Sequence, residues 1–151
     1  MEPVVEAAPA AAVRPLRHAV LRPHQRPEEL VYPGDDDPAA GHFVARDAGG
    51  EVVGAASVVP EPPPWDPARA DAWRLRGMAT APGRRGQGIG ARLLAAATAH
   101  AAVNGCRLLW CNARLPAVAF YERAGMAVRG TPFEEAGIGP HVAMWRTVGP
   151  G

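Results

Sequence analysis

The stretch at residues 78–94, MATAPGRRGQGIGARLL, constrains the fold more than any other part of the sequence. A strand-like run ends at Thr80, a Pro-Gly turn follows, and strongly helix-forming sequence begins after a cluster of glycines. These glycines are Gly86, Gly88 and Gly90. The first N–H groups of a helix have no partner within it, and the helix dipole adds positive charge there. Because glycine cannot shield these amides, the stretch predicts a site for an anion such as pyrophosphate.

Two common phosphate-binding motifs do not fit this loop. A P-loop ends in Gly-Lys-Ser/Thr, and this chain contains no lysine. A dinucleotide fingerprint is formally met by Gly86, Gly88 and Ala91, but it requires an acidic residue about 20 positions later. Residues 72–121 contain no Asp or Glu, so this motif fails too. An ordinary glycine-rich strand–helix turn remains as the alternative.

The charges are unevenly distributed along the chain. The net charge of +1 gives no reason to expect a nucleic-acid or membrane partner. Twelve of the fifteen acidic residues precede residue 72, whereas residues 72–121 carry seven arginines, among them Arg84 and Arg85 beside the glycines. This basic middle suits a polyanionic cofactor, although arginines that merely cover the surface would give the same count.

The length of 151 residues fits one domain. We expect residues 1–12, which are rich in Ala and Pro, to be a disordered tail, and residues 13–151 to form the domain. No apolar run is long enough to span a bilayer, and no signal peptide is recognisable, so a cytoplasmic protein is expected. No metal-ligand cluster is recognisable, and Cys106 and Cys111 would face opposite sides of one strand, which disfavours a disulfide.

The order of predicted elements indicates a mixed α/β sheet. The strand at 107–112 is too apolar for an exposed edge, so we place it centrally and parallel to the strand at 73–80. Gly77 inside that earlier strand indicates a bulge or a close approach of another backbone. Strands are expected at 13–16, 42–46, 51–59, 73–80, 107–112, 126–133 and 141–148, and helices at 88–104 and 116–124.

A second motif, AVAFYERAG, occupies residues 117–125. Together with Arg85, Gly88 and Gly90, it resembles the signatures of the Gcn5-related N-acetyltransferase (GNAT) superfamily, in which the glycine loop binds the pyrophosphate of acetyl-CoA. The resemblance implies a GNAT-type acyl-CoA N-acyltransferase fold: a central twisted mixed sheet of six to seven strands with flanking helices. The segments LRHAV, GDDD and FEEAGIGPHVAM are similar to the ElaA-like branch.

The resemblance also implies roles for particular residues. Tyr121 matches the tyrosine that in many members protonates the departing CoA thiolate. Many members have Asn seven residues earlier, where this chain has Arg114; Asn112 is the candidate replacement. The expected acetyl-CoA-binding residues are Met78, Ala79, Thr80, Arg84, Arg85, Gly86, Gln87, Gly88, Ile89, Gly90 and Asn112.

These residues suggest a chemical hypothesis in which a primary amine attacks the acetyl thioester directly in a ternary complex. A phenol with a pKa near ~10 stays protonated at neutral pH, which suits Tyr121 as the general acid; packing against Phe120 is the alternative role. The general base is open among a water chain and several side chains, of which His141 titrates in the useful range. The other side chains are Glu51, Asp71, Glu134 and Glu135.

The acceptor is not identified by the sequence. The acidic loop at residues 35–37 would favour a cationic small-molecule or peptide amine, although a solvated turn explains the same residues. Trp73 and the prolines of residues 60–67 could line an acceptor pocket. A non-catalytic acyl-CoA sensor and a nucleotide-binding module are the rival functions, and a homodimer is compatible with the family.

Overall fold

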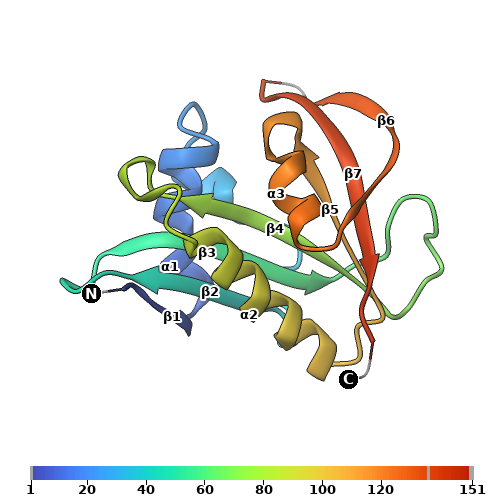
Figure 1. Cartoon of the computed structure of the whole chain (residues 1–151), viewed down its shortest axis with the longest axis horizontal. Helices are drawn as coiled ribbons and strands as arrows, with labels where there is room; N and C mark the ends of the chain where they lie inside the picture. Colours follow the sequence, from blue (N-terminus) through green and yellow to red (C-terminus); the bar gives the residue numbers. More distant parts are fainter. Residues whose placement is uncertain (1, 136, 150–151) are drawn as a thin grey trace.

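A single mixed sheet organises the protein. The computed structural model describes residues 2–135 and 137–149, and within them the strands follow the order β1-β2-β3-β4-β5-β7-β6 (Figure 1). Neighbouring strands are antiparallel except β4 and β5, which are parallel as predicted. The strands are β1 (Val4–Ala7), β2 (Gly41–Arg46), β3 (Val52–Pro60), β4 (Ala72–Thr80), β5 (Leu108–Arg114), β6 (Ala127–Glu135) and β7 (Gly139–Thr147).

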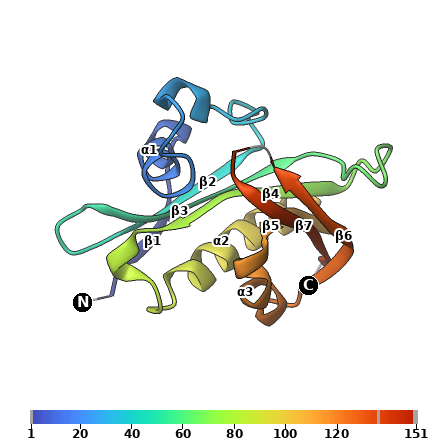
Figure 2. The ribbon, with the colours of Figure 1, turned by 90° about the horizontal axis from the view of Figure 1, so that it is seen from above.

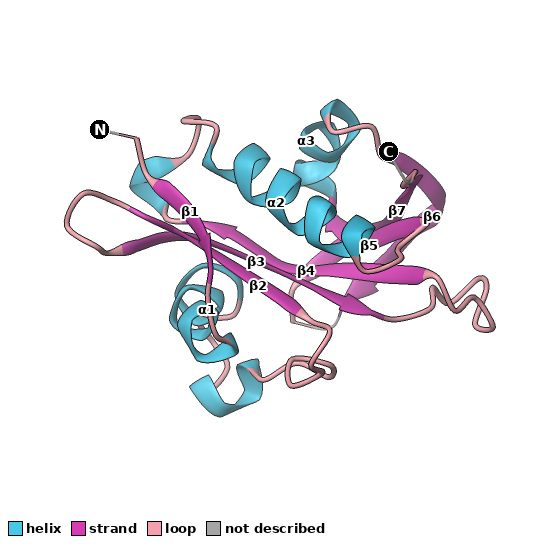
Figure 3. Cartoon of the chain, turned by 90° about the horizontal axis from the view of Figure 1, so that it is seen from below, coloured by secondary structure: helices cyan, strands magenta, loops and turns pink. Residues whose placement is uncertain are grey.

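Helices cover both faces of the sheet. Helix α1 lies on one face, while α2 and α3 lie on the other (Figure 3). The helical segments are α1 (Ala10–Leu16), the π-helical turn η1 (Arg17–Leu21), η2 (Pro27–Leu30), η3 (Pro82–Arg84), α2 (Ile89–Val103), η4 (Leu115–Ala117) and α3 (Val118–Arg123). None of the described helices is long and apolar enough to cross a membrane.

Helix α2 packs on the sheet through its predicted apolar face. Ile89, Leu93, Ala97 and Ala101 are all buried, as their helical spacing predicts. On β3, a Cβ added to Gly54 would lie 2.7 Å from Leu93 Cδ1. The absence of a side chain at this position therefore allows the helix to approach the strand closely.

The N-terminal segment corrects the prediction of a disordered tail over residues 1–12. Residues 4–7 pair with β2, with Val4 opposite Arg46, and an alanine-rich helix begins at Ala10. Met1 lies outside the described residues, and the strand expected at residues 13–16 is instead part of α1. Composition alone misled here because the open edge of β2, which pairs with this segment, is created only by the fold.

Strands β4 and β5 separate soon after they begin. Their pairing extends only from Ala72 opposite Leu108 to Arg74 opposite Trp110. The register of β4 against β3 also shifts between Ala55 and Ser57, and Gly77 lies in this irregular part with φ +64°. The predicted bulge at Gly77 is therefore confirmed, and its positive φ explains the glycine. The separation leaves the β5-facing edge of β4 unpaired at its end (Figure 1).

A buried ion pair attaches the η1 segment to the sheet. Arg17 donates from Nη1 to Asp35 Oδ2 at 2.7 Å and from Nη2 to Asp35 Oδ1 at 3.0 Å. The same guanidinium also donates to Ser57 Oγ and to the carbonyl of Leu30. Asp35 additionally accepts from the amide of Tyr32. Asp35 is thus a structural residue and does not line an entrance for a cationic acceptor.

The pKa of Asp35 follows from these contacts. Burial by itself would raise the pKa, but the hydrogen bond and charge of Arg17, with the Tyr32 amide, hold it below its ordinary value. The ionised carboxylate is therefore the form that stabilises the fold.

We expect the substitution Asp35→Asn to lower the free energy of unfolding by about 3–5 kcal/mol, because it leaves the Arg17 charge buried without its partner. The exposed neighbour Asp36 offers a matched control, and Asp36→Asn should change stability by less than about 0.5 kcal/mol. The difference between wild type and Asp35→Asn should be full above the ordinary carboxyl pKa of 3.8. It should shrink as the pH falls through the lower folded-state pKa. Urea unfolding at several pH values measures this; equal losses in both variants would contradict it.

Candidate active site

A groove of about 730 Å³ runs beside the end of β4 and the start of α2. Nine of the predicted cofactor-binding residues line it: Met78, Ala79, Thr80, Arg84, Arg85, Gly86, Gly88, Ile89 and Gly90. Residues of η4 and α3 line the groove as well. Figure 2 shows α2 and α3 together on this side of the sheet. The structure thus brings the predicted strand end and the predicted loop into one cavity.

The glycines of the loop leave the start of α2 open. Gly86 and Gly88 both adopt φ +78°, and an added Cβ at either would meet nothing within 4 Å. Gly88 is the N-cap of α2, no side chain caps this end, and its first turn contains no acidic residue. Gly90 differs, because an added Cβ would lie 3.2 Å from Phe120 Cε1. Within the described part of the chain, no protein group is therefore bound by the first amides of α2 beside the groove, as an anion site requires.

Arginines surround this helix start. Arg84 donates from Nε to Gln87 Oε1 at 3.0 Å, and its Nη1 lies 3.9 Å from Asp47 Oδ2 in the β2–β3 turn. Gln87 itself is not among the lining residues, so it positions Arg84. Arg123 of α3 also lines the groove. Sequence reasoning missed Arg123, because nothing local to α3 shows which face meets the loop.

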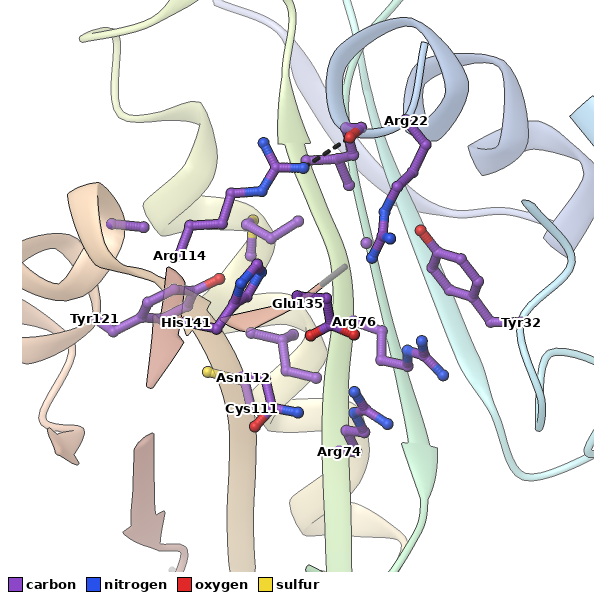
Figure 4. Close-up of a pocket in the computed structure, with 15 residues that line it drawn as sticks. Arg22, Tyr32, Arg74, Arg76, Cys111, Asn112, Arg114, Tyr121, Glu135 and His141 are labelled. Carbon is purple, nitrogen blue, oxygen red and sulfur yellow. Dashed lines mark hydrogen bonds between the residues drawn. The ribbon is translucent and has the colours of Figure 1, made fainter. Parts of the chain in front are cut away.

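A second, smaller pocket of about 130 Å³ lies next to the groove. The two cavities share Leu21, Met78, Arg114 and Ala117 in their linings. The pocket contains Tyr121 and His141, and Figure 4 shows both on the same side of it. Asn112 lines this pocket and does not line the groove. The structure therefore does not place it beside the other predicted cofactor-binding residues.

Tyr121 is 7% exposed and packs edge-to-face with Phe120, with ring centroids 5.0 Å apart. Packing and a place in the pocket are therefore compatible roles for this residue. Among the described residues, no hydrogen-bond partner is present for its hydroxyl group. Burial, with a smaller effect of Cys111, raises the pKa of Tyr121 far above its ordinary value. The phenol therefore remains protonated and able to donate.

His141 is 5% exposed and lies near the start of β7. Its Nδ1 lies 2.9 Å from the carbonyl oxygen of Gly139, which can only accept a hydrogen bond. The proton is therefore on Nδ1, and in the neutral ring Nε2 carries the free electron pair. The ring stacks on Phe133 with centroids 6.1 Å apart. This arrangement leaves His141 able to accept a proton at Nε2.

The other candidate bases fall into two groups. Glu135 lines the pocket with His141, whereas Glu51, Asp71 and Glu134 do not. Asp71 is instead paired with Arg69 at 2.6 Å. Of the side chains considered as the general base, the structure therefore places only His141 and Glu135 at the pocket.

Two further residues of β5 lie at the pocket. Arg114 donates from Nη2 to the carbonyl of Leu21 at 2.7 Å, which connects β5 to η1 across the cavity (Figure 4). Cys111 is 2% exposed, and burial raises its pKa to about 12. A thiol with this pKa is a poor nucleophile at neutral pH, so an acyl-enzyme on Cys111 is disfavoured. Cys111 and Cys106 are both free, but the prediction that they share one strand is wrong, because Cys106 precedes β5 and both side chains belong to the main core.

The structure does not place Trp73 and the prolines of residues 60–67, predicted as an acceptor wall, in the described lining of the groove or of the pocket. Trp73 is 4% exposed and belongs to the main core, and neither it nor these prolines line the pocket. The β3–β4 loop that carries most of these prolines extends away from the sheet (Figure 2). The pocket is lined instead by Tyr32 and Arg22, which no sequence pattern indicated.

Known proteins share this architecture. The solved structure of a GNAT-superfamily phosphinothricin acetyltransferase from Sinorhizobium meliloti, in complex with acetyl-CoA, matches with a TM-score of 0.75 at 20% identity, covering 100% of this chain and 91% of that one. Escherichia coli ElaA matches with a TM-score of 0.75 at 18% identity, covering 95% and 99%. At these identities the likeness concerns the fold, and it does not assign the chain to the ElaA-like branch.

Sequence similarity extends to the family level. YitI, an uncharacterized N-acetyltransferase of Bacillus subtilis strain 168, is 38% identical over 134 residues, 88% of either chain. The sequence profile of the acetyltransferase (GNAT) family matches residues 11–126, which include the loop, the end of β4 and Tyr121. The chain therefore belongs to the GNAT family and is an N-acetyltransferase that uses acetyl-CoA as co-substrate.

Proposed function

We propose that this protein transfers the acetyl group from acetyl-CoA to a primary amine by direct attack in a ternary complex. The observation that carries the proposal is the junction of two cavities beside the end of β4. The groove is open to the amides of α2, and the pocket holds Tyr121 and His141. Cofactor and acceptor would thus enter from different sides and meet at the lining that both cavities share.

The groove suits each part of acetyl-CoA. The pyrophosphate would accept hydrogen bonds from the first amides of α2, with Arg84 and Arg85 supplying full charges. The pantetheine arm would pair with the edge of β4 at residues 78–80, which β5 leaves free. An amide in the bulge near Gly77 would stabilise the oxyanion that forms on the thioester carbonyl.

The chemistry then needs one base and one acid. The amine nitrogen attacks the carbonyl carbon, forming the C–N bond, and its proton passes to Nε2 of His141. The tetrahedral intermediate collapses as the C–S bond breaks, and the sulfur takes a proton from the hydroxyl of Tyr121. Water returns a proton to Tyr121 and removes one from His141. The products are the N-acetylated amine and CoA with a free thiol.

We expect Gly88→Ala to weaken acetyl-CoA binding by about 10- to 100-fold, because a methyl group would stand over amides that bind a charged ligand. Gly50 is a matched control, since it has a similar φ of +84° and equally open surroundings, but lies in the β2–β3 turn. Gly50→Ala should cost similar stability, about 1–2 kcal/mol, without affecting binding. Calorimetric titration with acetyl-CoA separates the two effects; unchanged affinity in Gly88→Ala would place the cofactor elsewhere.

We expect Tyr121→Phe to lower kcat by at least about 100-fold, the usual contribution of a general acid. The affinity for acetyl-CoA should stay the same, because the hydroxyl acts on the leaving sulfur only. Steady-state kinetics with calorimetry measures both quantities. Full turnover by this variant would remove Tyr121 from the mechanism.

The two candidate bases can be compared directly. His141→Gln should lower kcat by about 100-fold or more, whereas Glu135→Gln should leave kcat within about tenfold of wild type. Both variants should bind acetyl-CoA normally, since neither residue lines the groove. The reverse order of the two kcat values would assign the base to Glu135.

A further inference from the structure

The small pocket beside the groove is strongly basic. Four arginines line it, and Glu135 is its one carboxylate among the described lining residues. The arginines are Arg22, Arg74, Arg76 and Arg114. Such a lining does not suit the cationic amine that the acidic loop at residues 35–37 suggested. The charge of the pocket therefore bears directly on which acceptor it binds.

Two of these arginines already have protein partners. Arg74 donates from Nη1 to Glu61 Oε2 at 3.1 Å, and it lies over the Trp110 ring at 4.8 Å. Arg114 donates to the carbonyl of Leu21. Their positions are thus explained by the fold, and their charges add to the field in the pocket.

Arg22 and Arg76 are different. Within the described chain, neither guanidinium lies within 4.0 Å of a carboxylate. The Nε of Arg22 is buried without a hydrogen-bond partner in the described structure. Arg76 lies over the ring of Tyr32, with its Cζ 4.2 Å from the ring centroid. A buried donor without an acceptor costs free energy, so Arg22 is prepared to bind an anion, and Arg76 adds a second charge without a carboxylate partner to the same pocket lining.

The surrounding carboxylates do not neutralise these two charges. Asp35 is paired with Arg17 and Glu61 with Arg74, and Glu135, the carboxylate that lines the pocket, lies more than 4.0 Å from both guanidinium groups. Burial, together with the charge of Arg74, lowers the pKa of Arg76 to about 10, so the side chain is still charged at neutral pH. An acid group entering the pocket would relieve this repulsion among guanidinium groups.

The pocket also has two chemically different sides. Figure 4 shows Arg22, Arg74 and Arg76 on the side of η1 and β4, and Tyr121 and His141 on the opposite side. At about 130 Å³ the pocket is smaller than the ~300–1,000 Å³ of sites that enclose drug-sized ligands. It therefore suits a small molecule whose amine and acid ends are separated by a short chain.

We infer that the acceptor is a small amine that also carries an acid group, a carboxylate or a phosphate, which Arg22 and Arg76 bind. The acid end lies against these guanidinium groups, and the amine faces His141 and the acetyl thioester. This inference rests on the proposed function of the same pocket. It replaces the preference for a cationic acceptor, because Asp35 is paired with Arg17 and none of residues 35–37 is among the described residues that line the pocket or the groove.

The test compares acceptors in matched pairs. An α-amino acid and its α-amide form the first pair, phosphoethanolamine and ethanolamine the second, and spermidine represents the polycations. Acetyl transfer is followed by release of the CoA thiol and by the mass of the product. We expect the acidic member of at least one pair to have a kcat/KM at least tenfold above its neutral partner. The pair that responds distinguishes carboxylate from phosphate. Equal or better acetylation of the neutral amines or of spermidine would overturn the inference.

Substitutions of Arg22 and Arg76 test whether these two residues cause the preference for an acidic acceptor. Arg76→Gln and Arg22→Gln should each lower kcat/KM for the acidic acceptor by about 10- to 100-fold, the effect of losing a charged hydrogen bond. The neutral partner should change by less than about threefold, and affinity for acetyl-CoA should not change. Arg69→Gln, in the β3–β4 loop and outside both cavities, is the control. Equal losses for acidic and neutral acceptors would contradict a role in recognising the acid.

Direct binding separates this inference from the proposed function. The acidic amines are titrated calorimetrically into the complex of the protein with CoA. If no amine is acetylated but an acidic amine binds and Arg76→Gln weakens it, the transfer mechanism fails and the acid-binding site stands. If none of the acidic amines binds, the acid-binding site is refuted.

Discussion

Parallel strands β4 and β5 stay paired for only three residue positions, and much of the site depends on where that pairing stops. An unpaired strand edge in the middle of a sheet would normally be costly, because its amides and carbonyls lose their partners. Here the bulge at Gly77 and the separation of the strands expose such an edge beside the start of α2. A ligand with its own amide groups can complete the pairing. The groove and the smaller pocket meet along this opening.

Two kinds of positive charge lie around that opening. At the groove the charge comes from backbone amides at a helix start, assisted by Arg84 and Arg85, and glycines keep the approach clear. At the pocket it comes from guanidinium groups, which are carried by η1, β4 and β5. The buried pair of Arg17 and Asp35 holds η1 against the sheet, and so supports the position of Arg22. This buried pair thereby helps to shape the pocket that we propose for the acceptor.

Much of the fold could be predicted locally. The helix at α2, the hairpin of β2 and β3, the bulge at Gly77 and the loop of the groove follow from short-range patterns of glycine, proline and apolar residues. The N-terminal strand could not, because its paired residues lie 36 to 42 positions away in sequence, from Ala7 opposite Phe43 to Val4 opposite Arg46. Asp35 was misjudged for the same reason, since its partner Arg17 lies 18 residues earlier.

The residues of the candidate site likewise fall into those that local sequence specifies and those that only the fold brings together. The loop at residues 85–90, the end of β4 and Tyr121 are predictable from sequence, because backbone geometry and a contiguous motif specify them within short segments. That His141 and Glu135 share the pocket with Tyr121 follows only from the folded arrangement of the strands. The fold also decided that Arg22, from a π-helical turn, stands beside Arg76 of β4. Charges from distant segments act together only when the chain folds them into one cavity. No local sequence pattern shows which distant segments will become neighbours.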